Sequence, residues 1–158
     1  GGIDIIDRIR DLESFILKKE DLKMISVKKI VEYVSSSINF PVTIEGDAKV
    51  LADEALFSVF ENLMRNAIIH GKTDKIKVEI RSKGKISEIK FIDYGKGLPE
   101  SIRNNLFEEG ISFGENKGSG LGLFIVKRTI ERYGGKIKVE DNKPKGTIFV
   151  IKLKCVKE

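Results

Sequence analysis

Residues 118–127 read G-S-G-L-G-L-F-I-V-K, in which three alternating glycines lead directly into an apolar run. Glycine lets the backbone adopt positive φ and approach a ligand closely. The apolar run continues to Ile130 and predicts a helix that is buried over its first turns. A helix N-terminus offers free N–H groups and the positive end of a dipole, so this junction suits an anion. Taken alone, the stretch is equally consistent with a flexible turn before a core helix.

Neither of the common phosphate loops accounts for this stretch. A Rossmann fingerprint needs glycine where Leu123 stands, and a P-loop would close with Gly-Lys-Ser or Gly-Lys-Thr. Other parts of the chain must therefore identify it.

Length and composition limit the classes of protein that need consideration. The 158 residues suffice for one ordinary domain with its own core, and the 41% apolar fraction is typical of globular proteins. No apolar run approaches the length of a membrane span, and there is no signal peptide. The lysines behind the net charge of +5 are scattered, which disfavours nucleic acid as a partner. The single cysteine, Cys155, fits a reducing compartment, so we expect this domain to be cytoplasmic. Since the chain starts without methionine, any membrane anchor of the full-length protein is expected upstream.

The N-terminal residues carry a narrow apolar seam. Ile5, Ile9, Leu12 and Ile16 follow one another at helical spacing. This pattern predicts a helix over residues 3–19 that is the end of a bundle or coiled coil, with a plain amphipathic helix as the alternative.

The remaining chain alternates helical and strand patterns. Helices are expected over 27–38 with Ser26 as N-cap, from the N-cap Asp53 to about His70, over 99–107, and after the glycine loop. Strands are expected over 42–45, 49–51, 75–81, 86–93, 136–141 and 147–154. This order predicts an α+β, two-layer sandwich with a mixed, mainly antiparallel sheet and helices on one face.

Two polar clusters are candidates for chemistry. Asn62, Asn66 and His70 are four residues apart on one helix face, and amide oxygens suit Mg²⁺ that is shared with phosphate. A solvated polar face is the alternative, and His70 is more simply a helix-end residue than a reactive group. Asp93 closes a strand before a glycine-rich turn and could accept a hydrogen bond from a base amine, although an aspartate in a turn is common.

Taken together, these residues resemble one family. E-N-L-M-R-N-A-I-I-H at 61–70 is similar to the N box of sensor histidine kinases, and D-Y-G-K-G-L-P at 93–99 to their first glycine box. L-F-E-E-G-I-S-F at 106–113 resembles the F box, and 118–127 with E-R-Y-G-G at 131–135 the second glycine box. With G-T-I-F at 146–149, the resemblance runs from about 26 to 154 and points to the ATP-binding catalytic domain, which has the Bergerat fold.

The resemblance implies ATP and Mg²⁺ as cofactors and assigns roles to matching positions. Asn66, assisted by Asn62, would be the catalytic metal ligand, Asp93 would receive the adenine amine, and residues 98–117 would form an ATP lid anchored by Phe107 and Phe113. The remaining nucleotide-binding positions would be Gly95, Gly97, Leu98, Lys117, Gly118, Ser119, Gly120, Leu121, Gly122, Leu123 and Thr147.

The resemblance also implies partners. Residues 1–22 would end a dimerisation and phosphotransfer helix, and 23–158 would be the catalytic domain. The full-length protein would be a homodimer that phosphorylates a histidine on its own bundle and then serves a response regulator. The helix that carries this phosphoacceptor is not in the chain, and His70 belongs to the N box instead.

Departures from the family pattern bear on the reaction. A basic residue common in the family is replaced by Ile69, and an arginine of some branches by Ser112, so Lys117, Lys96 or Arg65 would have to face phosphate. Hydrolytic relatives place a general-base glutamate where Asn62 stands, and Glu61 is about 100° away around the helix. This favours a histidine kinase over an ATPase. A protein-serine kinase or anti-sigma factor of the same fold, and an inactive nucleotide-binding module, are the alternatives.

Overall fold

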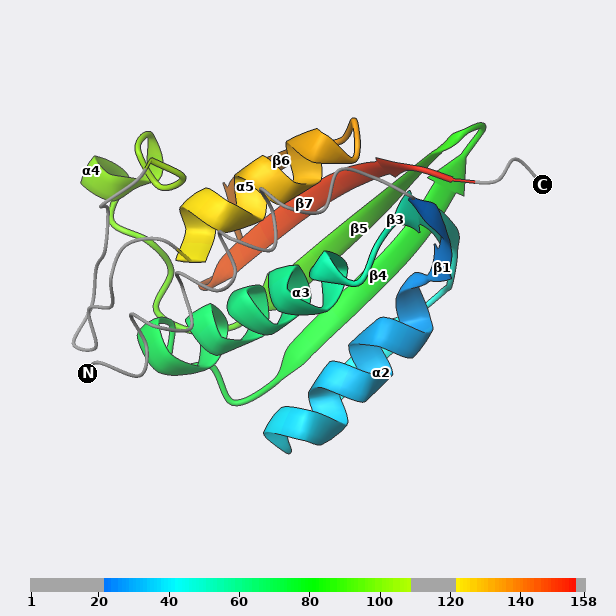
Figure 1. Ribbon diagram of the computed structural model, residues 1–158. Helices are drawn as coiled ribbons and strands as arrows, with labels where there is room; N and C mark the ends of the chain where they lie inside the picture. Colours follow the sequence, from blue (N-terminus) through cyan, green and yellow to red (C-terminus); the bar gives the residue numbers. More distant parts are fainter. Residues whose placement is uncertain (1–21, 109–121, 156–158) are drawn as a thin grey trace, which may run out of the picture.

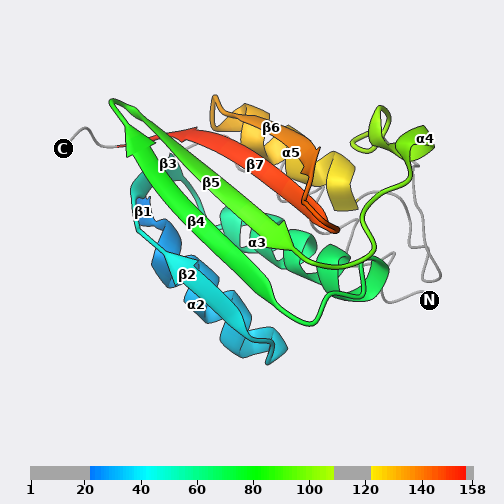
Figure 2. The same cartoon turned by 180° about the vertical axis from the view of Figure 1, so that it is seen from behind.

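In the computed structural model, residues 22–108 and 122–155 are described, and they form a two-layer sandwich (Figure 1). Helices α2 (Val27–Ile38), α3 (Ala55–Arg65) and α5 (Gly122–Arg132) lie side by side on one face of a sheet. Seen from behind, the strands lie in front of these helices (Figure 2). The predicted α+β architecture is confirmed.

The main sheet is mixed and mainly antiparallel, as expected. Its strand order is β2-β4-β5-β7-β6, in which only β2 and β4 are parallel neighbours. The strands are β2 (Val42–Glu45), β4 (Ile76–Lys83), β5 (Ile86–Asp93), β6 (Lys136–Asp141) and β7 (Thr147–Lys154). The register pairs Ile76 with Asp93 and Ile92 with Ile148. The central strand β5 therefore ends between the start of β4 and the start of β7.

A second, two-stranded sheet joins the beginning of the described chain to the strand that precedes α3. It pairs β1 (Lys23–Ser26) with β3 (Lys49–Ala52) in antiparallel register. The sequence pattern predicted β3 to within one residue but missed β1. Four residues give too short a pattern for recognition, and the partner of β1 lies more than twenty positions further along the chain.

The helices form where the apolar periodicity placed them. The Ser26 hydroxyl accepts a hydrogen bond from the Lys29 amide at 3.3 Å, and α2 ends at Asn39 in the left-handed region, with φ of 52°. Between the helices and the sheet, rings such as Phe60 and Phe91 pack with centroids 4.9 Å apart. The core face predicted for the long helix from Asp53 to His70 is buried: Leu56, Val59, Phe60, Leu63, Met64 and Ala67 are at most 6% exposed.

The long helix that the sequence predicted from Asp53 to His70 needs two corrections. It begins at Ala55, with Glu54 at the N-cap position, although the Asp53 carboxylate still accepts a hydrogen bond from the Ala55 amide at 3.0 Å. From Asn66 to His70 it continues as a π-helix, η1, in which the Gly71 amide reaches the Asn66 carbonyl at 3.1 Å. A π turn adds one residue and is frequent at functional sites, but apolar periodicity does not reveal it.

Helix α4 is shorter than predicted. It spans Glu100–Arg103 rather than 99–107. Residues 104–107 form turns, in which backbone amides donate to the carbonyl three residues earlier. Two adjacent asparagines, Asn104 and Asn105, explain the early end because asparagine competes with the helix for backbone hydrogen bonds.

A buried charged cluster ties the start of α3 to the end of α5. The Asp53 carboxylate accepts hydrogen bonds from the Arg132 guanidinium at 2.8 Å and from the Tyr133 hydroxyl. Burial by itself raises the pKa of Asp53, but the hydrogen bonds from Tyr133, Arg132 and the Ala55 amide together hold it below its usual value.

The predicted helix over 3–19 lies outside the described residues, and the predicted domain boundary at 22 lies at their edge. Within the described residues, no helix has the length and apolar character needed to cross a bilayer.

Candidate functional site

Four segments that carry the sequence motifs meet at one end of the sandwich. In Figure 1 this end holds the carboxyl end of α3 with η1, the helix α4, the beginning of α5, and the point where β7 starts beside the end of β5. The N box and the first glycine box, which are separate in the sequence, therefore lie next to each other.

Asp93 is the best-defined polar group at this end. Its residue is 5% exposed, and its Oδ1 accepts hydrogen bonds from the backbone amides of Gly95 at 3.0 Å and Thr147 at 3.1 Å. Among the described residues, its second oxygen accepts no hydrogen bond. A buried carboxylate with one unoccupied oxygen is an acceptor for a ligand donor.

The pKa of Asp93 reflects this setting. Burial raises it above the ordinary carboxyl value, and the two amide hydrogen bonds only partly oppose that effect. A donor that approached the second oxygen would favour the charged form and so relieve part of the cost of burial. The side chain is thus arranged for a hydrogen bond that the described residues do not supply.

The turn after Asp93 packs tightly on the end of η1. The Lys96 amide donates to the Gly71 carbonyl at 2.7 Å, and a Cβ added to Gly95 would lie 2.0 Å from that same oxygen. Only glycine fits at position 95 because a backbone atom blocks the space. Within the described residues the backbone that approaches this turn closely is that of the N-box segment, and the role of Gly95 and Gly97 in nucleotide binding stays a prediction.

The turn between β6 and β7 packs against Asp93 on the side away from η1. A Cβ on Gly146, whose φ is +115°, would lie 2.1 Å from the Asp93 carbonyl, and one on Gly97 would lie 3.4 Å from the Gly146 carbonyl. Asn142 donates through Nδ2 to the Asp93 carbonyl at 2.9 Å. Thr147 was a predicted site residue and lies at Asp93.

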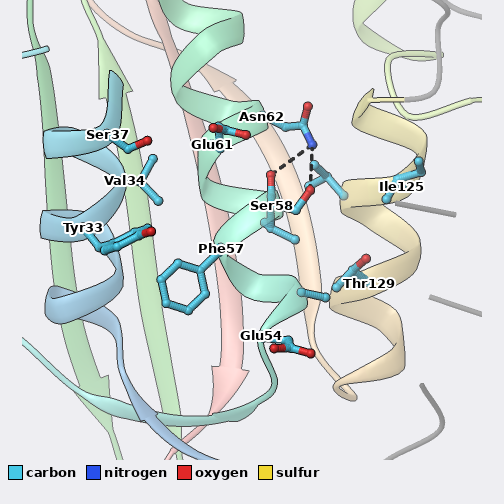
Figure 3. A pocket seen from close by; sticks show the side chains of 13 residues that line it. Tyr33, Val34, Ser37, Glu54, Phe57, Ser58, Glu61, Asn62, Ile125 and Thr129 are labelled. Atoms are coloured by element: carbon cyan, nitrogen blue, oxygen red, sulfur yellow. Dashed lines mark hydrogen bonds between the residues drawn. The ribbon is translucent and has the colours of Figure 1, made fainter. Parts of the chain in front are cut away.

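Asn62 lies on the side of α3 that faces α5. It is 7% exposed, and its Nδ2 donates to the Ser58 carbonyl at 3.0 Å. In Figure 3 its amide oxygen points away from Ser58, along α3 towards the carboxyl end. Asn66, half-buried, begins η1 one turn later. This placement keeps both predicted metal ligands on the N-box helix, and the described residues contain no cluster of three or more acidic, histidine or cysteine side chains that could hold a metal.

The three cations considered as partners of phosphate differ in their pairing, in their exposure and in whether the structure describes them. Arg65 forms an exposed ion pair with Glu61 at 3.5 Å, and Lys96 is exposed on the turn beside η1, whereas Lys117 lies outside the described residues. Burial and then the positive charge of Lys96 hold the pKa of His70 below its usual value, which favours a neutral imidazole. His70 is the last residue of η1.

Apolar candidates support the walls of the site. Leu98 and Leu123 are half-buried against the core, and Phe107 meets Phe149 edge to face with centroids 6.2 Å apart. Gly122 begins α5. Outside the described residues lie Phe113, Lys117, Gly118, Ser119, Gly120 and Leu121.

A hollow of about 310 Å³ opens elsewhere, between α2, α3 and α5 (Figure 3). It is lined by residues such as Tyr33, Phe57 and Thr129, and of the predicted site residues that the structure describes it contains only Asn62. It is therefore distinct from the space beside Asp93. Glu61 also lines it and forms its ion pair with Arg65 at 3.5 Å.

Sequence reasoning missed two polar side chains near Asp93. Thr73, 7% exposed, accepts a hydrogen bond from the Tyr94 amide at 2.9 Å, and Asn142 donates to the Asp93 carbonyl. The stretch around Asn142 is typical of a turn, and nothing in the sequence near Thr73 indicates a role. Strand register alone could have suggested them, because it places both segments beside the end of β5.

Comparison with known proteins agrees with this geometry. Residues 52–157 match the family of histidine kinase-, DNA gyrase B- and HSP90-like ATPases. The sensor histidine kinase CitA of Klebsiella pneumoniae is 34% identical over 64% of the chain and 19% of its own length. A probable C4-dicarboxylate sensor kinase of Halalkalibacterium halodurans is 31% identical over 83% of the chain and 24% of its own length. The chain thus spans about a fifth to a quarter of these curated relatives.

Solved structures show the same fold. The mycobacterial sensor histidine kinase MprB has a TM-score of 0.74 at 24% identity, over 87% of this chain and all of that one. Histidine kinase AdeS of Acinetobacter baumannii has a TM-score of 0.76 at 21% identity, over 94% of this chain and 76% of that one. The family match covers most of the chain and includes Asp93, the N-box asparagines and the turn at Gly146, so this protein belongs to the histidine kinase-, DNA gyrase B- and HSP90-like ATPases.

Proposed function

We propose that this chain is the ATP-binding catalytic domain of a sensor histidine kinase, and that it transfers the γ-phosphoryl group of ATP to a histidine on a dimerisation and phosphotransfer bundle. The observation that carries the proposal is Asp93, a buried carboxylate with one oxygen held by two backbone amides and the other left for a ligand donor. The 6-amino group of adenine is such a donor. The sensor kinases among the relatives favour this reaction over others of the family.

In this proposal the base and the phosphates occupy different walls of the site. Adenine would lie against the turn of Gly95 and Gly97, with its amine on Asp93. The phosphates would extend towards Asn66 and Asn62 on the N-box helix. The family implies Mg²⁺, and the donor set fits it, since amide oxygens are hard ligands that leave room for water and phosphate. Bound Mg²⁺ would neutralise phosphate charge during transfer.

The choice of a kinase over a hydrolase rests on the side chain one turn before Asn66. That position is Asn62, whose amide donates to the Ser58 carbonyl and cannot remove a proton from water. Glu61 pairs with Arg65 on the exposed surface. With Asn62 in the place of the general base, a neutral imidazole that needs no deprotonation is the better nucleophile, and positioning carries the reaction.

Nucleotide binding is tested by thermal melts of the chain with Mg-ATP. At ligand about 100 times Kd, the expected stabilisation is about 2.7 kcal/mol. Asp93→Ala should remove this shift, and Lys143→Ala, an exposed change on the neighbouring turn, should keep it. No shift with ATP, or an equal shift in Asp93→Ala, contradicts the assignment.

Transfer needs a separate assay. The chain is mixed with ATP and a bundle fragment that carries the histidine, and acid-labile phosphate on the fragment is the expected product. Asn66→Ala should abolish this label while the melting curve of the free protein is kept. Label on serine would favour the protein-serine kinase alternative, and binding without any label would favour an inactive nucleotide-binding module.

The proposed partners follow from the same assignment. A second copy of the full-length protein would form the dimer through the bundle, and a response regulator would take the phosphoryl group from its histidine.

A further inference from the structure

We propose that Thr73 and Asn142 are positioning residues for base recognition, which hold the peptide group after Asp93 from its two sides and thereby fix which carboxylate oxygen is offered to the base. The proposal rests on the function proposed above, because it concerns the same aspartate. It adds two residues that make no contact with the base themselves.

The peptide between Asp93 and Tyr94 is held at both of its polar atoms. Its carbonyl oxygen accepts a hydrogen bond from Asn142 Nδ2 at 2.9 Å. Its N–H donates to Thr73 Oγ1 at 2.9 Å. The two partners come from opposite neighbours of β5, since Thr73 precedes β4 and Asn142 follows β6 in the turn that leads to β7. A flip of this peptide would break both hydrogen bonds at once.

Both partners are themselves fixed. The Thr73 hydroxyl donates to the Lys75 carbonyl at 2.8 Å, and the Thr73 amide donates to the Ala67 carbonyl at 3.2 Å. The backbone N–H of Asn142 donates to the Gly146 carbonyl at 3.0 Å, which closes the turn between β6 and β7. The Thr73 side chain is thus held by the backbone of its own segment, and Asn142 is held through its backbone amide.

The orientation of this peptide controls the carboxylate. Gly95 follows directly, and its amide must turn back to reach Asp93 Oδ1 at 3.0 Å. That return depends on the orientation of the intervening peptide, because the backbone rotations on either side of it, at Asp93 and at Tyr94, set where the Gly95 amide lies relative to the carboxylate. With Oδ1 held by Gly95 and Thr147, the second oxygen is the one left for the base amine. Loosening the peptide would let the carboxylate rotate, so that its second oxygen would no longer point in one fixed direction.

The test compares ADP with inosine diphosphate, which has a carbonyl in place of the adenine amine. Wild-type protein is expected to favour ADP by at least tenfold, the effect of one hydrogen bond to a charged group. Asn142→Ala and Thr73→Val should each weaken ADP binding about fivefold, the effect of one neutral hydrogen bond, while inosine diphosphate affinity stays within twofold. Thr73→Ser keeps the hydroxyl and should restore the wild-type ratio.

Controls separate this inference from the proposed function. Lys143→Ala changes an exposed side chain on the same turn as Asn142 and should leave the ratio unchanged. Asn142 is only half-buried, so Asn142→Ala carries the test if Thr73→Val fails to fold. Equal losses of ADP and inosine diphosphate affinity in Asn142→Ala would overturn the inference but leave Asp93 as the adenine acceptor. A wild-type protein that binds both nucleotides equally would overturn the assignment of Asp93 and this inference with it.

Discussion

The carboxylate of Asp53 is expected to be the most stabilising polar group that lies outside the nucleotide site. It joins the loop before α3 to the end of α5 through Arg132 and Tyr133, and the side chains of Asp53 and Arg132 are 11% and 13% exposed. Removing one partner of a buried ion pair deprives the other charge of its counter-ion, which costs about 3 to 5 kcal/mol. We therefore expect Asp53→Ala to lower the free energy of unfolding by about 4 kcal/mol, or the melting temperature by about 12 °C at about 3 °C per kcal/mol.

The contribution of Tyr133 can be separated by a double-mutant cycle. Tyr133→Phe removes one hydrogen bond to a charged acceptor and should cost about 2 kcal/mol. In the Asp53→Ala background that hydrogen bond no longer exists, so the same change should cost little. The expected coupling energy is then about 2 kcal/mol, measured by urea denaturation of the wild type, both single variants and the double variant.

The exposed ion pair of Glu61 and Arg65 provides the matched control. It also joins an acid and an arginine, at i and i+4 on α3, but its side chains are 42% and 51% exposed. Glu61→Ala should therefore cost no more than about 0.5 kcal/mol. If Asp53→Ala costs as little as Glu61→Ala, the desolvation of Asp53 cancels its interactions and the reasoning is wrong.

Three further predictions concern pH, packing and metal. In a carbon NMR titration, Asp93 should lose its proton above pH 3.8 and Asp53 below it, and a shared pKa would refute this. The stability that Asp53 contributes is therefore complete above pH 3.8 and is lost as the pH falls through its lowered pKa. The stability that Asp93 contributes is lost as the pH rises through its raised pKa. Gly95→Ala should abolish ADP binding in calorimetry because the added Cβ meets the Gly71 carbonyl. The control is Gly84→Ala, whose added Cβ would have no atom within 4 Å, so this variant should bind ADP normally and lose only about 1 kcal/mol of stability from its positive φ. Chelation of Mg²⁺ should reduce the thermal shift with ATP but not that with adenosine, and an equal reduction for both would place the metal away from the phosphates.

The regular elements could be predicted from the sequence because their side chains alternate or repeat with the period of the backbone. Strands β6 and β7 have the predicted bounds, and the ends of α2 agree with the capping residues Ser26 and Asn39. These signals are local: a cap or an alternating face is encoded within a few positions. The motif order then indicated the family, which the comparisons confirm.

What could not be predicted depends on contacts between distant segments. Asp53 was expected only as a helix cap, yet its main partners lie 79 and 80 positions away in the sequence. The unoccupied oxygen of Asp93 could not be foreseen either, because Gly95 is local but Thr147 lies 54 residues away. No periodic pattern records such pairs, and only the register of the strands brings them together.

The π turn at the end of the N box illustrates how a local irregularity shapes the distant site. In a regular α-helix the Gly71 amide would bond to the Ala67 carbonyl, but here it bonds to Asn66 and leaves the Ala67 carbonyl for the Thr73 amide. Thr73 is thereby held where its hydroxyl receives the Tyr94 amide. One extra residue in the helix that carries the two asparagines proposed as metal ligands thus connects that helix to the peptide beside Asp93, the proposed acceptor of the base. The two halves of the proposed nucleotide site are therefore built on one continuous set of hydrogen bonds.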